Sequence, residues 1–236
     1  MNIAIIFAGG TGTRMGAELP KQFIEIQNKP ILIHTLELYQ NHKKIDKIYI
    51  SILKEYFEYT EKLVQKYNIS KVAGIVCGGE TGMDSIYNAL SLAYEENDGD
   101  SIVLISDGVR PLITDETIDN NIAGVIEKGN AITTTACFET ILLSEDGGQT
   151  VKSVPIRRHT FAAQAPQSFY LKDIIEAHNE VRRTPTRYTD LVDSCTLMKS
   201  LNKEVHIVEG NRNNIKITTP YDVVIYEALL NNSHAN

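Results

Sequence analysis

Short apolar runs alternate along this chain with longer segments in which apolar residues recur at helical spacing. The short runs predict strands at residues 3–7, 47–53, 72–77 and 101–106. The longer segments predict helices at residues 30–41, 54–67 and 83–95. Such alternation is typical of a parallel sheet whose strands are joined by crossover helices. We therefore predict an α/β fold, a Rossmann-like and mostly parallel sheet flanked by helices.

The pattern changes beyond residue 130, where β-rich segments replace the alternation. These segments are residues 131–138, 140–143 and 151–156. A turn rich in glycine and acidic residues separates the last two segments, as in a two-stranded excursion. We predict one domain at residues 1–230 with a protruding β-arm at about 138–161, followed by a flexible tail at 231–236.

Composition is ordinary for a globular protein of 236 residues, with 42% hydrophobic and 22% charged residues. The formal net charge of −7 argues against a nucleic-acid-binding surface, because such a surface needs clustered Lys and Arg. The three cysteines, Cys77, Cys137 and Cys195, form no Cys-x-x-Cys pair. We expect them to be buried reduced thiols, without a zinc site or a disulfide framework.

Neither a targeting segment nor a membrane span is expected. The first apolar run has only five residues, which is too short for the core of a signal peptide. No stretch approaches the roughly 18 apolar residues that a membrane span needs. We expect a cytoplasmic protein that does not contact the membrane.

Three loops that follow predicted strands are candidates for the chemistry. They cover residues 8–14, 78–85 and 107–111. In a doubly wound sheet, ligands bind beyond the carboxyl ends of the strands, so these loops should meet in one site. The first loop, Ala-Gly-Gly-Thr-Gly-Thr-Arg, has small residues that let a ligand approach the backbone.

The first loop departs from two common phosphate-binding motifs. No Lys-Ser or Lys-Thr follows its glycines, as a Walker loop requires, and Met15 stands at the third glycine position of a dinucleotide fingerprint. What remains is a turn whose amides can cradle phosphates, followed by two cations, Arg14 and Lys21. We predict that these two cations neutralise a triphosphate.

Five motifs occur together in an order and spacing typical of one enzyme family. They are Ala-Gly-Gly-Thr-Gly-Thr-Arg-Met (8–15), Pro-Lys-Gln-Phe (20–23), Asp-Gly-Val-Arg-Pro (107–111), Ala-Pro-Gln-Ser-Phe (165–169) and Asn-Ile-Lys-Ile-Thr (214–218). From residue 3 to about residue 230, the chain resembles the sugar-alcohol-phosphate cytidylyltransferases. This group contains enzymes for 2-C-methyl-D-erythritol 4-phosphate and for ribitol 5-phosphate. The resemblance implies a nucleotide-diphospho-sugar transferase type of fold, with CTP and an alditol phosphate as substrates and Mg²⁺ as cofactor.

The resemblance also implies a nucleotidyl transfer. A phosphate oxygen of the acceptor attacks the α-phosphorus of CTP, and magnesium pyrophosphate leaves. Such a reaction needs positioning and charge neutralisation more than a protein nucleophile, because the attacking phosphate is already ionised at neutral pH. We therefore expect arginines and lysines to outnumber general bases in the site.

On the donor side, the resemblance assigns charge stabilisation to Arg14, Lys21 and Lys216. Lys216 also stands between two isoleucines that should point the opposite way, into the core. The other implied nucleotide-binding residues are Ala8, Gly9, Gly10, Thr11, Gly12 and Thr13 at the phosphates, and Gly78, Gly79, Asp84 and Ser85 at the cytosine and ribose. Asp107 is a candidate neighbour or ligand of Mg²⁺, which prefers carboxylate and phosphate oxygens. Alternatively, Asp107 caps the turn before Arg110.

On the acceptor side, the resemblance implies a homodimer in which the arm completes the neighbouring site. Thr140 and Arg157 match the arm residues that reach the acceptor phosphate, and Arg158 is the alternative to Arg157. Asp193 is a candidate for holding acceptor hydroxyl groups.

Other roles stay open for part of the acceptor set. Thr189-Asp190 is an alternative to Asp193, and all three residues could instead cap helices. Arg110 either braces its own loop or meets the acceptor.

Two residues depart from the resembled family. Gly82 stands where many relatives carry an arginine, which affects the expected nucleotide contacts of that loop. Ser106 stands where the family often has histidine, and we expect its hydroxyl to hydrogen-bond locally.

Sequence details favour one acceptor over the other. Asp-Gly-Val-Arg-Pro at 107–111 is closer to the ribitol-phosphate branch, since the erythritol branch more often has Asp-Ala-Ala-Arg-Pro. We therefore expect CDP-ribitol as product, for a surface polymer such as teichoic acid or capsule. The alternative is a 2-C-methyl-D-erythritol 4-phosphate cytidylyltransferase of isoprenoid synthesis, or an enzyme for another alditol or sugar phosphate.

Two other classes of function remain as alternatives. An NAD-linked oxidoreductase needs an acidic residue at the end of the second strand to hold a ribose, and Glu55 is the one candidate. A non-catalytic binding relative would use its cations for solubility alone.

Overall fold

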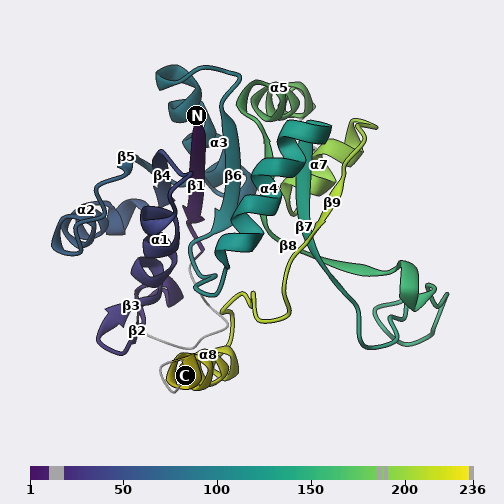
Figure 1. Cartoon of the computed structure of the whole chain (residues 1–236). Coiled ribbons are helices and arrows are strands. Elements are labelled where there is room, and N and C mark those ends of the chain that lie inside the picture. Colours follow the sequence, from purple (N-terminus) through teal and green to yellow (C-terminus); the bar gives the residue numbers. More distant parts are fainter. Residues whose placement is uncertain (11–18, 185–187, 189–190, 234–236) are drawn as a thin grey trace.

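A seven-stranded mixed sheet forms the centre of the protein, whose computed structural model describes residues 1–10, 19–184, 188 and 191–233 (Figure 1). The strand order is β5-β4-β1-β6-β8-β7-β9. The strands are β1 (Asn2–Ala8), β4 (Lys47–Ile52), β5 (Val72–Cys77), β6 (Ile102–Asp107), β7 (Asn130–Ala136), β8 (Phe161–Tyr170) and β9 (Ile207–Glu209). The four strands predicted from apolar runs are confirmed, and they pair in parallel as β5-β4-β1-β6.

The other half of the sheet changes direction at β8. This strand runs antiparallel to both β6 and β7, and β9 then pairs in parallel with β7. A separate hairpin of β2 (Glu25–Ile26) and β3 (Lys29–Pro30) turns through Gln27 and Asn28, both with positive φ. Of the seven strands, β8 alone runs against the others, so the prediction of a mostly parallel sheet is confirmed.

Helices pack on both faces of the sheet (Figure 1). They are α1 (Ile31–Asn41), α2 (Phe57–Lys66), α3 (Gly82–Glu96), α4 (Asp115–Lys128), α5 (Leu171–Arg182), α7 (Ser194–Ser200) and α8 (Pro220–Ser233). The three predicted helices correspond to α1, α2 and α3, although a short 3₁₀ turn, η3 (Lys54–Tyr56), occupies the start of the second one. Helix α8 extends to Ser233, so it occupies the start of the region predicted as a tail.

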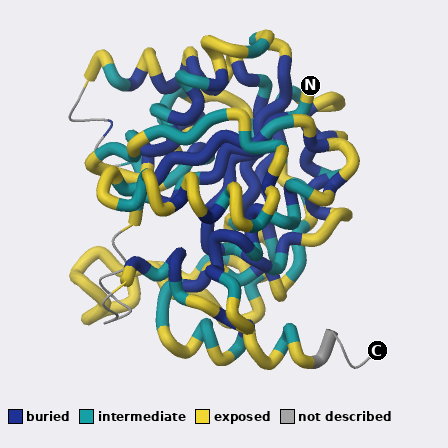
Figure 2. Tube along the Cα trace, turned by 90° about the vertical axis from the view of Figure 1, so that its left-hand side faces the viewer, coloured by how far each residue is buried: buried dark blue, intermediate teal, exposed yellow. Residues whose placement is uncertain are grey.

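Strand β1 shows why the central strands are continuously apolar. Ile3 and Ile5 pack on one face with α3 and α5, whereas Ala4 and Ile6 pack on the other with α1 and α4. Because side chains alternate along a strand, a strand covered on both faces needs apolar residues at every position. The buried segments cross the middle of the molecule and leave exposed residues on the outer helices (Figure 2).

Residues 137–160 leave the body of the protein between β7 and β8 (Figure 1). Most of their side chains are exposed, and a single bridge joins Leu143 to Ser153. The sequence had predicted β structure to residue 138 and paired segments beyond it, whereas β7 ends at Ala136. Few side chains shield this excursion from water, so little apolar burial is available to extend the pairing.

The cysteines differ from the prediction in their exposure. All three thiols are free, as expected, but Cys77 is exposed and Cys137 and Cys195 are only half-buried. Burial was therefore the wrong expectation for Cys77, which ends the edge strand β5, where the sheet has no further neighbour. None of the helices within the described ranges is long and apolar enough to cross a bilayer.

Candidate functional site

Two adjoining cavities lie at the carboxyl ends of β1 and β6, where the sequence predicted a ligand. The glycine-loop pocket has a volume of about 350 Å³, and its walls include Gly9, Gly10, Lys21, Thr81 and Gly82. The Asp193 pocket has a volume of about 230 Å³ and contains Gln164, Gln167, Asp193 and Ser194. Phe7, Asp107 and Lys216 line both cavities, so the two pockets share one wall.

Close packing around Ser85 shapes the glycine-loop pocket. Its Oγ accepts a hydrogen bond from the backbone of Gly79 at 3.1 Å and donates one to the Thr81 carbonyl at 3.0 Å. A Cβ atom added to Gly9 would lie 2.7 Å from the same Oγ, and one added to Gly78 would lie 2.9 Å away. The glycines let two loops approach one buried hydroxyl. Ser85 therefore holds the backbone of this pocket in place from the side away from the cavity.

Lys21 and Gln22 complete the described part of the first loop. They belong to the 3₁₀ turn η2 (Lys21–Phe23), and a Cβ atom at Gly10 would lie 3.9 Å from Cε of Lys21. The buried Gln22 amide donates to the Ala8 carbonyl at 2.7 Å and thereby holds the end of β1. The predicted residues Thr11, Gly12, Thr13 and Arg14 lie outside the described residues.

Asp107 forms the centre of the shared wall and is only 5% exposed. Its Oδ2 accepts a hydrogen bond from Nε of Arg110 at 2.8 Å, and its Oδ1 lies 2.5 Å from Nζ of Lys216. Burial alone would raise the pKa of Asp107, but the charges of Arg110 and Lys216 outweigh it and hold the pKa below its ordinary value. The ionised carboxylate therefore keeps Lys216 at the boundary between the two pockets.

Arg110 mainly braces the loop in this arrangement. Besides its bond to Asp107, it donates from Nη1 to the Asn214 carbonyl at 2.8 Å. The Asn214 amide in turn donates to the Ala165 carbonyl at 2.6 Å. These bonds connect the loop after β6 to β8 and to the segment that carries Lys216, while Arg110 still lines the Asp193 pocket.

The shared wall does not form a metal site from protein ligands alone. Both carboxylate oxygens of Asp107 already pair with cations. Across the residues that the structure describes, no group of three His, Cys, Asp or Glu side chains could hold a metal ion. A divalent cation here would need most of its oxygen ligands from a substrate or from water.

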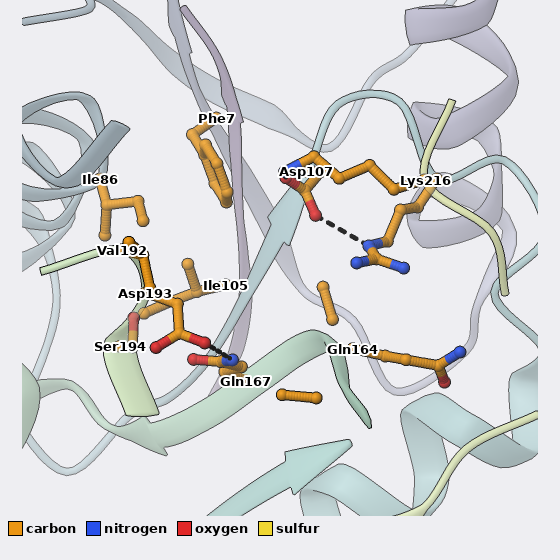
Figure 3. A pocket seen from close by; sticks show the side chains of 13 residues that line it. Phe7, Ile86, Ile105, Asp107, Gln164, Gln167, Val192, Asp193, Ser194 and Lys216 are labelled. Atoms are coloured by element: carbon orange, nitrogen blue, oxygen red, sulfur yellow. Dashed lines mark hydrogen bonds and ion pairs between the residues drawn. The ribbon is translucent and has the colours of Figure 1, made fainter. Parts of the chain in front are cut away.

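The Asp193 pocket holds a second fixed carboxylate, that of Asp193, in a cavity lined by both apolar and polar side chains (Figure 3). Asp193 Oδ1 accepts from the Thr196 backbone at 2.8 Å and caps α7, and Oδ2 accepts from the Gln167 amide at 2.9 Å. Gln167 Oε1 accepts from the Cys195 backbone at 2.8 Å. Capping, which the sequence offered as an alternative role, is thus present, and the same carboxylate still lines the pocket.

Predicted residues at the edges of the site have varied surroundings. Asp84 caps α3 together with Thr81, and its Oδ1 lies 2.6 Å from Nη1 of Arg182. Gly82 lines the glycine-loop pocket, and a Cβ atom added there would meet nothing within 4 Å. Ser106 is fully buried, and its hydroxyl interacts with that of the buried Tyr39, which partly offsets the rise that burial causes in the pKa of Tyr39.

The arm residues lie away from both cavities of their own chain. Thr140, Arg157 and Arg158 are exposed, and Arg157 donates from Nη1 to the Phe138 carbonyl at 3.3 Å. Among the described lining residues of the two pockets, none comes from the arm. The same holds for Glu55, the candidate ribose ligand of an NAD enzyme, which is exposed in η3.

Sequence reasoning missed three residues that the site uses. Gln22 and Gln167 stand inside motifs that had been recognised, so their motif positions were an available signal. Arg182 carried no such signal, because its contact with Asp84 joins residues 98 positions apart.

Comparison with known proteins identifies the family. Residues 2–232 match the 2-C-methyl-D-erythritol 4-phosphate cytidylyltransferase family. The chain belongs to this family. It is thus a nucleotidyltransferase by family, and cytidylyltransferases of this kind generally use a divalent cation.

Named relatives of this cytidylyltransferase fall into two groups. The chain is 47% identical to a ribitol-5-phosphate cytidylyltransferase of Vibrio parahaemolyticus, over 98% of this chain and 96% of the relative. It is 44% identical to a Streptococcus agalactiae enzyme of the same name, over 97% and 95% of the two chains. A 2-C-methyl-D-erythritol 4-phosphate cytidylyltransferase of Clostridium botulinum is 35% identical, over 97% of both chains.

A solved structure agrees with the fold of this cytidylyltransferase. The 4-diphosphocytidyl-2C-methyl-D-erythritol synthase of Anaerococcus prevotii superimposes with a TM-score of 0.82 at 28% sequence identity. The comparison covers 98% of this chain and 96% of the other. The predicted family, fold and enzyme class are therefore confirmed.

Helix α5 buries a histidine, His178, whose titration should make the folded protein less stable in acid. Burial, helped by the nearby charge of Arg182, lowers the pKa of His178 to about 3. An unfolded chain protonates this histidine near pH 6.5, so it binds more protons than the folded protein between these values. Stability should therefore fall as the pH falls, by about 2 kcal/mol between pH 7 and pH 5 from this group alone.

Urea unfolding of a His178→Asn variant at pH 7 and pH 5 tests that prediction. The loss of unfolding free energy on acidification should be about 2 kcal/mol smaller than in the wild type, because asparagine does not titrate. A His159→Asn variant, changed at an exposed arm residue, should keep the wild-type loss. An unchanged loss in His178→Asn would contradict the assignment.

Proposed function

We propose that this enzyme joins CTP and D-ribitol 5-phosphate to give CDP-ribitol and pyrophosphate. The main support is the wall of Phe7, Asp107 and Lys216 that the glycine-loop pocket and the Asp193 pocket share. A triphosphate in the first pocket and a phosphorylated polyol in the second would have their phosphates at this wall. Lys216 would then lie at the place where the new bond forms.

The proposed reaction is a direct displacement. A phosphate oxygen of the acceptor forms a bond to the α-phosphorus of CTP, while the bond from that phosphorus to the oxygen bridging to the β-phosphate breaks. Pyrophosphate leaves with that bridging oxygen, and no proton has to be removed from the attacking phosphate at neutral pH. Lys21 and Lys216 would neutralise the charge that builds up on the α-phosphate and the leaving group, together with Arg14.

Binding of the nucleotide is assigned mainly to backbone groups. The amides of the first loop would meet the phosphates, and the backbone around Gly78 and Gly79 would surround the cytosine and ribose. Asp84 and Ser85 act behind these backbones in this proposal, since their side chains bond to Thr81 and Gly79. Mg²⁺ would bind mainly to the triphosphate, near Asp107, and would supply charge neutralisation of the phosphates.

The acceptor assignment is supported by the relatives and by the Asp193 pocket. The enzymes named for ribitol 5-phosphate are 44–47% identical to this chain, compared with 35% for those named for methylerythritol phosphate. In the Asp193 pocket, a carboxylate held by Gln167 can accept hydrogen bonds from polyol hydroxyl groups. CDP-ribitol would serve a surface polymer such as teichoic acid or capsule, and a cytoplasmic location suits an enzyme that consumes CTP.

The arm is proposed to complete the acceptor site of a second copy of this chain. Its cationic and hydroxyl groups, Arg157 and Thr140, are exposed and lie away from the pockets of their own chain. Phe138, Leu142 and Val154 are exposed on the same segment, which gives the arm apolar surface to bury in a homodimer. In that dimer, Arg157 and Thr140 would bind the acceptor phosphate.

Pyrophosphate release from a matrix of substrates tests the proposal. CTP, UTP and ATP are each combined with ribitol 5-phosphate, methylerythritol 4-phosphate, ribulose 5-phosphate and glycerol 3-phosphate. CTP with ribitol 5-phosphate should give the highest kcat/KM. Turnover of methylerythritol phosphate alone would overturn the acceptor assignment, and no turnover with any CTP pair would favour a non-catalytic relative.

A further inference from the structure

Arg182, the last residue of α5, reaches across to the start of α3 and is held on three sides. Its guanidinium lies over the ring of Tyr87, with 4.3 Å from Cζ to the ring centroid, and 4.8 Å from the centroid of Tyr188. Its Nη1 donates to Oδ1 of Asp84 at 2.6 Å. A planar guanidinium can stack on rings and donate in its own plane at once, whereas an ammonium lacks this shape.

The ion pair connects Arg182 to the glycine-loop pocket. Asp84 Oδ2 accepts from the Thr81 hydroxyl at 2.7 Å and from the Thr81 backbone at 3.2 Å. Thr81 Oγ1 in turn accepts from the Asp84 backbone at 3.1 Å. Thr81 lines the pocket, so a displacement of Asp84 would be transmitted directly to the pocket wall.

The second ring connects Arg182 to the Asp193 pocket. Tyr188 shares a hydrogen bond of 3.1 Å between its hydroxyl and Nδ1 of the buried His178. The Tyr188 carbonyl accepts from the Leu191 backbone at 3.2 Å. Val192 and Asp193, which come directly after Leu191, line the Asp193 pocket. The position of Tyr188 therefore affects the position of Val192 and Asp193, which we call the acceptor wall.

The loop before α3 has few side chains of its own to hold it. Gly82 adds none, and the space beside it is open. Glu80, Thr81 and Gly82 all line the cavity. Support for this loop consequently comes from behind, through Ser85 and through the pair of Asp84 with Arg182.

We propose that Arg182 is a positioning residue. It fixes the loop leading into α3 (residues 80–82, the nucleotide loop) in its position relative to the acceptor wall. It touches neither substrate; it acts through Asp84 and Thr81 on one side and through Tyr188 on the other. The inference rests on the proposed function for the identity of the ligands, CTP and ribitol 5-phosphate. Loss of the guanidinium should weaken the binding of both ligands.

Arg182→Lys and Arg182→Met test the inference, with Arg183→Ala, directly after α5, as the matched control. Arg183 is the next residue and is exposed. The dissociation constant of CTP is measured by calorimetry without acceptor, and the KM of ribitol 5-phosphate and kcat are measured by pyrophosphate release. In Arg182→Met, CTP should bind about tenfold more weakly, the size expected when a charge-assisted hydrogen bond that shapes the site is lost. The KM of the acceptor should also rise several-fold, and Arg183→Ala should match the wild type.

The conservative variant separates positioning from general stability. Lysine keeps the charge but loses the planar stack, so Arg182→Lys should restore part of the CTP affinity. Tyr87→Leu, which keeps the ion pair and removes one ring, should weaken CTP binding in the same direction and by less. These two variants decide the question should Arg182→Met not fold.

Several outcomes would overturn the inference. One is a variant with a lowered unfolding midpoint but wild-type values for both the CTP dissociation constant and the acceptor KM, since that pattern shows a purely structural role. Another is a change in the binding of only one of the two ligands.

Failure of the proposed function gives a different result. If the wild type binds CTP but does not turn over ribitol 5-phosphate, the acceptor assignment fails. The effect of Arg182 on CTP affinity is still decided by calorimetry, and its effect on the acceptor wall by the KM of whichever acceptor in the matrix is turned over.

Discussion

Replacing Lys216 with alanine is expected to lower kcat for pyrophosphate release by about a thousandfold, the scale of losing a preorganised charge at a transition state. Lys216 lines both pockets, and its Nζ lies 2.5 Å from Asp107 in their shared wall. In the proposed reaction, charge builds up on the α-phosphate and on the departing pyrophosphate at this wall. Without the lysine, the buried carboxylate of Asp107 would also repel both phosphates.

Steady-state kinetics with CTP and ribitol 5-phosphate give the measurement. Asp107 keeps Arg110 as a partner in the variant, so the fold should persist, and circular dichroism at the assay temperature checks this. Lys54→Ala, at an exposed residue of η3, is the matched control and should retain wild-type kcat. A Lys216→Ala enzyme within tenfold of the wild type would show that Lys216 lies outside the reacting centre.

Mixing two inactive variants is expected to recover activity if the arm serves the neighbouring chain. Lys21→Ala damages the glycine-loop pocket of its own chain, whereas Arg157→Ala damages the arm that the proposal places in the partner's site. A mixed dimer would then have one site with both defects and one site with neither. With random reassociation, about a quarter of all sites should be intact, and activity should rise to about that fraction of the wild type.

A second mixture provides the control for that experiment. Lys21→Ala and Lys216→Ala both alter the pockets of their own chain, so their mixed dimers have no intact site and should stay inactive. Native mass spectrometry shows whether mixed dimers form. Mixed dimers without recovery in the Lys21→Ala and Arg157→Ala pair would contradict the shared site. If Arg158 rather than Arg157 is the phosphate ligand, Arg157→Ala should be active by itself, and Arg158→Ala should be the inactive variant that recovers activity when mixed with Lys21→Ala.

The sequence was most informative where local patterns decide the structure. Strands β1, β4, β5 and β6 were predicted to within about a residue at each end, because strands covered on both faces must be apolar throughout. The glycines after β1 and β5 were also informative, since a Cβ atom at Gly9 or Gly78 would lie within 3 Å of Ser85. Recognised motifs then placed Lys21, Asp107 and Lys216, and the structure brings all three to the walls of one cavity.

Prediction was weaker where a residue's role depends on a distant partner. Asp84 was predicted at the nucleotide, but its carboxylate caps α3 and pairs with Arg182, which is 98 positions away. Asp107 was a candidate metal ligand, whereas both of its oxygens pair with cations. A single sequence shows that a carboxylate is present but does not show which side chains the fold brings to its oxygens.

The positions of β1, β4, β5 and β6 along the chain and the glycine-rich segment after β1 were thus determined by the sequence alone, because hydrophobic periodicity and turn chemistry act between near neighbours in the chain. Only the tertiary structure decided that Asp107 and Lys216 form the common wall of two pockets, and that Arg182 pairs with Asp84 beside the glycine-loop pocket. Those contacts join segments about a hundred residues apart, and they exist only once the sheet and its helices have packed together.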